Sequence, residues 1–196
     1  MNLPNKLTIL RIFLVPVFMV IMIAPIFPES ADMWLRITAA AIFILTALTD
    51  MLDGKLARKN NQTTNFGKFM DPLADKFMVF GAMLSILYRY DYIRPVFIWA
   101  ATIVMFRELA VTSVRLVACG NDGIVIAASI LGKIKTVTQI VCISTILLEP
   151  VLFSWFKPFD EYHILTYVTM AAMSVMTLWS GIDYIRKYWS HISPDK

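Results

Sequence analysis

Residues 49–76 read TDMLDGKLARKNNQTTNFGKFMDPLADK and set the character of the whole chain. This stretch carries four carboxylates, Asp50, Asp53, Asp71 and Asp75, within sequence that is otherwise apolar enough to lie in lipid. A charged side chain in the hydrocarbon of a bilayer is costly, so residues of this kind usually serve a function. Because four neighbouring carboxylates also repel one another, they must be protonated or bridged by cations.

The composition places the chain in a membrane. Of its 196 residues, 58% are hydrophobic and only 16% are charged, whereas soluble domains are about 45–50% apolar. The mean hydropathy is +0.66. A net charge of +4 gives no reason to expect nucleic acid as a partner. Cys119 and Cys142 lie far apart in the sequence, so neither a disulfide nor a thiolate metal site is expected.

Six apolar runs divide the chain into spans of roughly 20 residues. They cover approximately residues 7–26, 33–57, 66–87, 96–117, 130–148 and 162–185. The first run lacks a small-residue cleavage pattern, so we expect it to be retained as a span and not removed as a signal peptide. The predicted fold is an all-α integral membrane protein, with six transmembrane helices around a polar cavity that faces the cytoplasm. It forms a single domain over residues 1–196.

The basic residues are divided unequally between the two sides of this predicted membrane. One side holds only Arg36, Arg89, Arg94 and Lys157, and the other holds the remaining 14 of the 18 Lys and Arg residues. Lys and Arg concentrate on the cytoplasmic side of membrane proteins. Both termini and the four carboxylates are therefore expected in the cytoplasm, in a multi-pass protein of the cell membrane.

The carboxylates fall on two helical stripes. The spacing places them with small residues, namely Asp50, Asp53, Gly54 and Ala57 on the first stripe and Gly67, Asp71 and Asp75 on the second. Two antiparallel helices joined by the polar residues 58–65 would face each other with two carboxylates apiece. Ligands that are all oxygen favour hard cations, and Mg²⁺, Mn²⁺ or Ca²⁺ fit better than Zn²⁺.

A phosphate group is the expected ligand beside the metals. Gly54 and Ala57 remove side-chain bulk on the carboxylate face, and Arg58 follows directly with a guanidinium that binds phosphate oxygens. Further basic residues on the same side of the membrane would extend the site, namely Arg107, Arg115, Lys133 and Lys135. The plainer alternatives are that the glycines serve helix packing and that the basic residues only enforce topology.

The spacing of eight of these residues resembles the signature of the CDP-alcohol phosphotransferase family. Its positions are Asp50, Asp53, Gly54, Ala57, Arg58, Gly67, Asp71 and Asp75, with eight residues separating Arg58 from Gly67. Less specific similarity to the family extends over residues 2–11 (NLPNKLTILR), 107–115 (RELAVTSVR) and 128–136 (ASILGKIKT). The resemblance implies six transmembrane helices around a cytoplasm-facing cavity, in a homodimer.

The resemblance also implies a role for each residue. Asp50, Asp53 and Asp71 would ligate two divalent cations, Mg²⁺ or Mn²⁺, and Asp75 would complete the cluster and act as the general base. The donor, CDP-diacylglycerol, would be held by Gly54, Ala57 and Arg58, together with Asn5, Thr8 and Gly67. The acceptor phosphate is expected to meet Arg107, Arg115, Lys133, Lys135 and Arg11.

Within the family, the chain is most similar to members that transfer the phosphatidyl group from CDP-diacylglycerol to glycerol 3-phosphate. The expected products are phosphatidylglycerophosphate and CMP, formed by metal-assisted direct in-line attack. Another acceptor, such as inositol, inositol phosphate, serine or phosphatidylglycerol, is the alternative within the family. A cation transporter is the alternative outside it, since carboxylates in a membrane also mark ion paths.

Overall fold

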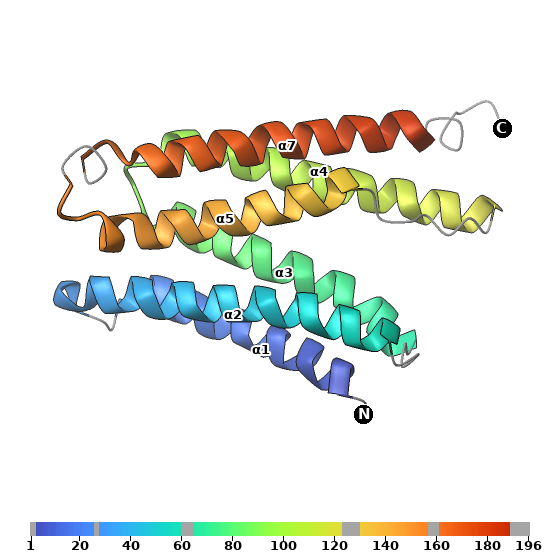
Figure 1. Cartoon of the computed structure of the whole chain (residues 1–196), viewed down its shortest axis with the longest axis horizontal. Coiled ribbons are helices and arrows are strands. Elements are labelled where there is room, and N and C mark those ends of the chain that lie inside the picture. Colours follow the sequence, from blue (N-terminus) through green and yellow to red (C-terminus); the bar gives the residue numbers. More distant parts are fainter. Residues whose placement is uncertain (1–2, 26–27, 60–64, 123–129, 157–160, 189–196) are drawn as a thin grey trace.

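The computed structural model describes residues 3–25, 28–59, 65–122, 130–156 and 161–188 (Figure 1). Within these ranges the chain forms only helices and turns. The helices are α1 (Leu3–Ile23), the short η1 (Glu29–Ala31), α2 (Asp32–Lys59), α3 (Asn65–Arg89), α4 (Arg94–Asp122), α5 (Ile130–Leu152) and α7 (Ile164–Tyr188). This confirms the all-α prediction.

Five of these helices are long and apolar enough to cross a membrane, namely α1, α2, α4, α5 and α7. The helix α3 is not among them, because Asp71, Asp75 and Lys76 interrupt its apolar sequence. At 25 residues it is about 37 Å long, which exceeds the roughly 30 Å of a bilayer core. Its length therefore suits a sixth span, while its charged half needs protein or water around it.

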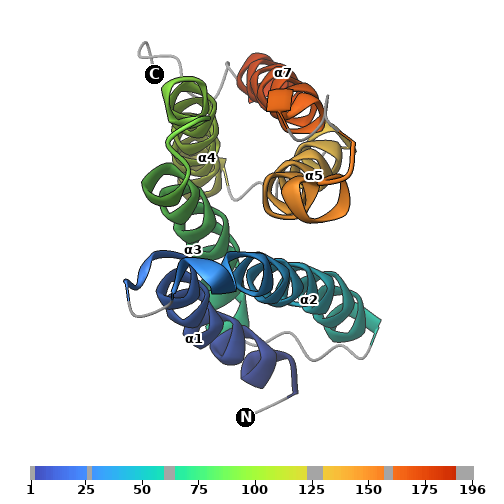
Figure 2. The same ribbon diagram turned by 90° about the vertical axis from the view of Figure 1, so that its left-hand side faces the viewer.

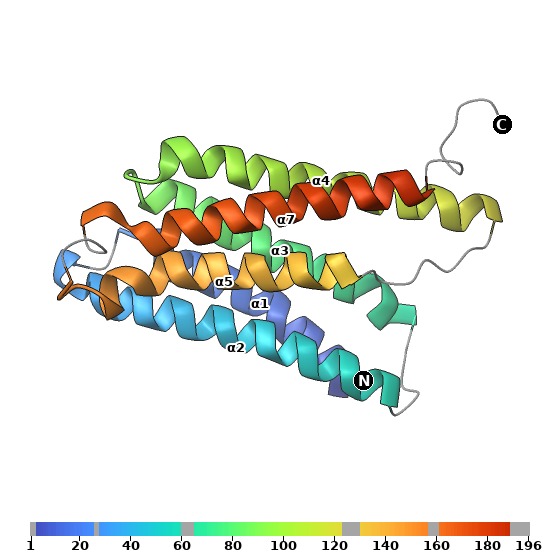
Figure 3. The ribbon, with the colours of Figure 1, turned by 45° about the horizontal axis from the view of Figure 1, so that its top comes forward.

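The helices form two groups that run along a common axis. The helix α1 packs against α2 and α3, whereas α7 packs against α4 and α5. Figure 2 shows the two groups end-on, and they meet where α2 contacts α5 and α3 contacts α4. The start of α1 and the end of α7 lie at the same end of the bundle (Figure 1), as an even number of membrane crossings requires. Figure 3 shows α7 alongside α4 and α5.

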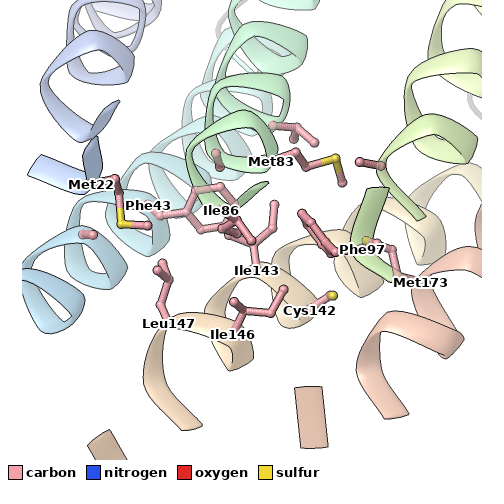
Figure 4. Packing of buried hydrophobic residues seen from close by; sticks show 14 of the residues in the cluster. Met22, Phe43, Met83, Ile86, Phe97, Cys142, Ile143, Ile146, Leu147 and Met173 are labelled. Atoms are coloured by element: carbon pink, nitrogen blue, oxygen red, sulfur yellow. The ribbon is translucent and has the colours of Figure 1, made fainter. Parts of the chain in front are cut away.

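The apolar core closes the bundle at the other end. Figure 4 shows part of this core, with side chains from all six α-helices: Met22, Phe43, Met83, Ile86, Phe97, Cys142, Ile143, Ile146, Leu147 and Met173. Met22 lies in the last turn of α1, and Phe97 lies in the first turn of α4, so this packing is near one end. Cys142 is a buried free thiol; the Cys119 side chain lies outside the described part of the structure.

Large apolar side chains also cover the outside of the bundle. Phe13, Trp99, Phe106 and Trp179 are each more than half exposed, with exposed fractions from 61% to 72%. On a soluble protein such a surface would be a liability. On helices of this length and hydropathy it is the surface that lipid covers, so the buried polar groups described below lie inside a membrane protein.

Candidate functional site

The carboxylate stretch folds as the end of α2 and the start of α3, as the helical spacing predicted. These two helices touch each other little, however, because α1 packs against both of them. The expectation of two directly facing carboxylate helices is therefore incomplete. The sequence predicted Thr8 and Arg11 of α1 at the site but not between these two helices, and both side chains reach a carboxylate.

Thr8 and Arg11 lie one helical turn apart on α1. The Thr8 hydroxyl donates a hydrogen bond of 2.6 Å to Asp71 Oδ1 on α3. The Arg11 guanidinium forms an ion pair with Asp50 on α2. Arg11 is 1% exposed, whereas the Asp50 side chain is 38% exposed. One face of α1 thus holds one carboxylate of each neighbouring helix and leaves Asp50 open to solvent on its other side.

The structure places Arg11 at the carboxylates, although it was grouped with the acceptor residues from sequence. Asn5 lies two turns before it on α1 and is buried. Arg11 carries a charge that partly neutralises Asp50 in this structure, and its predicted contact with the acceptor phosphate stays a prediction.

Asp75 is acted on by the charges of two groups of residues. It is half-buried on α3, and the charges that act on it most strongly belong to Asp50 and Arg11, on α2 and α1, and to Lys135 and Glu108, on α5 and α4. Its neighbour Lys76 donates a hydrogen bond from Nζ to Thr112 on α4. We define the acidic cluster as Asp50, Asp71 and Asp75. Asp75 is the member that interacts electrostatically with a second set of charges, on α4 and α5.

This second set is buried. Lys135 Nζ on α5 donates to Glu108 Oε1 on α4, and Arg107 Nη1 lies 3.3 Å from the same oxygen. All three residues are 9% exposed or less. We call Arg107, Glu108 and Lys135 the buried charge cluster. Two cations share one carboxylate, which leaves one positive charge without a counter-charge inside the cluster. Burying such a charge is costly unless an anion balances it.

The four basic residues predicted for the acceptor phosphate separate into two pairs. Arg107 and Lys135 belong to the buried charge cluster, whereas Arg115 and Lys133 are exposed. Of the two pairs, only Arg107 and Lys135 are joined by described contacts, which both residues make with Glu108. Sequence alone could not separate them, because all four lie on the same side of the predicted membrane.

Part of the predicted donor site lies outside the described side chains. Asp53, Gly54, Ala57 and Arg58 belong to α2, and Gly67 belongs to α3, but only their helical backbone is described. Among the described side chains, which exclude Asp53, no three His, Cys, Asp or Glu residues group closely enough to hold a metal ion. The predicted metal ligands therefore stay a prediction.

Two functional candidates were missed from sequence, Glu108 and Ser180. Glu108 joins α4 to α5, and the signal for it was an acidic residue inside an apolar span. Ser180 on α7 accepts a hydrogen bond of 2.6 Å from Arg107 Nη2. A serine in an apolar helix is common, so sequence carried no signal for this contact.

Comparison with known proteins agrees with the signature. A family model described as CDP-alcohol phosphatidyltransferase matches residues 1–179. A protein of Bacillus subtilis (strain 168) named CDP-diacylglycerol--glycerol-3-phosphate 3-phosphatidyltransferase is 42% identical over 196 residues, with 96% of this chain and 95% of the relative covered.

Proteins of the same name come from two further bacteria. The one from Escherichia coli (strain K12) is 36% identical, with 94% of this chain and 93% of the relative covered. The one from Pseudomonas fluorescens is 30% identical, with 100% and 94% covered. With the spacing from Asp50 to Asp75, these matches show that the chain belongs to the CDP-alcohol phosphatidyltransferase family.

Proposed function

We propose that this chain transfers the phosphatidyl group of CDP-diacylglycerol to glycerol 3-phosphate, as a phosphatidylglycerophosphate synthase. The names of its relatives state this activity for those proteins. The observation that carries the proposal for this chain is the presence in one bundle of carboxylates oriented by α1 and of a buried charge cluster with excess positive charge. The first suits a cation-bound pyrophosphate, and the second suits the phosphate of an acceptor.

The carboxylates of the acidic cluster have the donor chemistry that divalent cations need, and in our proposal Asp53 completes the site. Its donors are carboxylate oxygens, which hard cations such as Mg²⁺ and Mn²⁺ prefer, and enzymes of this family generally depend on divalent cations. In our proposal, Asp50, Asp53, Asp71 and Asp75 hold two such ions, which would neutralise the pyrophosphate of the donor. Thr8 and Arg11 orient two of these carboxylates, as partners behind metal ligands commonly do.

Asp75 acts as the general base. The terminal hydroxyl of glycerol 3-phosphate loses its proton to a carboxylate oxygen of Asp75, and its oxygen forms a bond to the phosphorus that bears the diacylglycerol. The bond from that phosphorus to the CMP oxygen breaks, and CMP leaves with the electron pair. The transfer is direct and in line, with Gly54, Ala57, Arg58 and Gly67 holding the nucleotide half of the donor.

The acceptor phosphate binds at the buried charge cluster. Arg107 and Lys135 share the carboxylate of Glu108, so the arriving anion adds the negative charge that balances the second cation. Arg115 and Lys133, which are exposed, attract the acceptor from solution.

The lipid tails of the donor stay in the bilayer while its headgroup enters the polar end of the bundle. We place this end in the cytoplasm of a bacterial cell, with α3 as the sixth span and the chain as a homodimer. The excess of Lys and Arg on this side supports the orientation.

The test is CMP release by purified protein from CDP-diacylglycerol and glycerol 3-phosphate with Mg²⁺ or Mn²⁺. Asp75→Asn and Asp53→Asn are each expected to reduce turnover by about 100-fold or more, the scale of a lost general base or metal ligand. Asp91→Asn is the matched control, because Asp91 is an exposed carboxylate in the turn between α3 and α4.

Near-wild-type turnover in Asp75→Asn would remove the proposed base. A panel of acceptors, with inositol, inositol phosphate, serine and phosphatidylglycerol beside glycerol 3-phosphate, identifies the second substrate. Product with one of the others and none with glycerol 3-phosphate would overturn the acceptor assignment while keeping the family chemistry.

A further inference from the structure

The side chain of Arg107 is held by α7 as well as by its own neighbours on α4 and α5. Its Nη2 donates to Ser180 Oγ at 2.6 Å, and Ser180 is 1% exposed. Its Nη1 lies 3.3 Å from Glu108 Oε1, which Lys135 contacts more closely. Its Nε is buried and has no hydrogen-bond partner among the described residues. Arg107 therefore keeps one unused donor and a charge that Glu108 only partly balances.

The stem of Arg107 is also fixed by α7. A Cβ atom added at Gly181 would lie 3.0 Å from Arg107 Cγ, which is closer than almost all real contacts of this kind. The absence of a side chain at position 181 lets the stem lie against the α7 backbone. Because Cγ is near the base of the side chain, a methyl group there would push the stem by a few tenths of an ångström and shift the guanidinium with it.

The contact of Ser180 differs from those of other hydroxyls on α7. Ser174 and Thr169 donate to carbonyl oxygens of their own helix, at Met170 and Leu165 respectively. This is the usual way in which a hydroxyl is satisfied inside a helix. Ser180 is instead the acceptor for a guanidinium on another helix, so its hydroxyl acts on Arg107.

We infer that α7, through Ser180 and Gly181, positions the guanidinium of Arg107 to receive the phosphate of the acceptor. This inference rests on the proposed function. Ser180 and Gly181 do not touch the substrate, and they act by holding Arg107 with its Nε and its uncompensated charge available to a dianion. Affinity for the phosphorylated acceptor is thus set partly by the last transmembrane helix, which contains none of the residues of the signature.

The test compares the kinetics of Ser180→Ala with those of Ser174→Ala, which removes a hydroxyl of the same helix that does not contact Arg107. Ser180→Ala is expected to raise KM for glycerol 3-phosphate about tenfold, the scale of a hydrogen bond to a charged group. Its kcat and its KM for CDP-diacylglycerol stay within about twofold of wild type. Ser174→Ala leaves all three unchanged.

Two further variants address the geometry. Ser180→Thr keeps the hydroxyl and is expected to restore KM for glycerol 3-phosphate toward the wild-type value. Gly181→Ala leaves Ser180 in place but displaces the stem, and it is expected to raise the same KM as Ser180→Ala does. If Ser180→Ala fails to fold, Gly181→Ala decides the question alone.

A double variant shows whether Ser180 acts through Arg107. In an Arg107→Lys background, Ser180→Ala is expected to have no additional effect on KM for glycerol 3-phosphate. Full additivity, or an unchanged KM in both Ser180→Ala and Gly181→Ala, overturns the inference. A wild-type protein that releases no CMP with glycerol 3-phosphate would instead overturn the proposed function, so the two failures are distinct.

Discussion

Thr8 and Arg11 show how much depends on single side chains at the acidic cluster. Each reaches a carboxylate on a different helix, Asp71 on α3 and Asp50 on α2. A carboxylate that already accepts a hydrogen bond on one oxygen is oriented before a cation arrives, and this lowers the cost of binding. We therefore expect these two residues of α1 to affect cation affinity more than donor affinity.

Thr8→Val tests this expectation, because valine keeps the shape of threonine and loses only the hydroxyl. The Mg²⁺ concentration that gives half-maximal CMP release should rise about tenfold, the lower end of the effect of losing such a partner. Thr8→Ser keeps the donor and should behave like the wild type. An unchanged Mg²⁺ dependence in Thr8→Val would show that the bond to Asp71 does not prepare a cation site.

Glu108 is the residue on which the buried charge cluster depends for stability. Glu108→Gln leaves Arg107 and Lys135 buried with no carboxylate between them, and breaking a buried pair in this way costs about 3–5 kcal/mol. The melting temperature in detergent should therefore fall. Adding Lys135→Met removes one of the two unpaired cations and should recover part of the loss. A double variant less stable than Glu108→Gln alone would contradict this account.

At the scale of elements, the sequence predicted where the helices are but not how they pair. The runs 33–57 and 66–87 correspond to α2 (Asp32–Lys59) and α3 (Asn65–Arg89), because long apolar stretches must be helical in lipid. The periodic pattern of apolar residues does not indicate which helix contacts which. The pair of Arg11 and Asp50 joins residues 39 apart, and the pair of Arg107 and Ser180 joins residues 73 apart.

The helix α7 is held near its start by a carboxylate of α5. Near its start, the Glu149 carboxylate of α5 accepts hydrogen bonds from the backbone N–H groups of Leu165 and Thr166, at 2.9 Å and 2.8 Å. These are N–H groups of the first turn, which have no partner within the helix. A buried carboxylate there satisfies two of them and interacts favourably with the helix dipole. Glu149 thereby fixes the hairpin of α5 and α7 far from the acidic cluster.

Replacing Glu149 should thus affect stability and leave the chemistry intact. Glu149→Leu is expected to cost about 2 kcal/mol, since two buried donors lose their acceptor. Glu149→Gln, which keeps one amide oxygen as an acceptor, should cost less. Glu161→Gln is the matched control, because Glu161 is exposed just before α7. Thermal unfolding in detergent measures the effect, and KM for both substrates should match the wild type in the folded fraction.

At the scale of the whole molecule, the two charged clusters and the largest apolar core lie in different halves of the bundle. The core around Phe43, Phe97 and Leu147 closes one end, and the acidic and buried charge clusters occupy the other half. The signature predicted the family because its residues are close together in sequence. It predicted the acceptor side only in part, since the burial of Arg107 and Lys135 and the exposure of Arg115 and Lys133 depend on the packing of α4, α5 and α7.

This arrangement gives a test of the proposed orientation and of α3 as a span. Cysteine is introduced singly at Asp91, in the turn between α3 and α4, and at Lys133 near the start of α5, in a background with Cys119→Ser and Cys142→Ala. Both sites are exposed and lie on opposite sides in the six-span arrangement. A membrane-impermeant maleimide should label Asp91→Cys in intact cells, and Lys133→Cys only after the cells are opened.

The expected pattern follows from the distribution of Lys and Arg, which is strongly biased toward the side of Lys133. Ser30→Cys provides a third site, because Ser30 is exposed in η1, between α1 and α2. It should label together with Asp91→Cys. Labelling of Ser30→Cys but not of Asp91→Cys in intact cells would mean that α3 does not cross the membrane. The reverse pattern at all three sites would place the active end outside the cell, where a cytoplasmic nucleotide-linked lipid headgroup could not reach it.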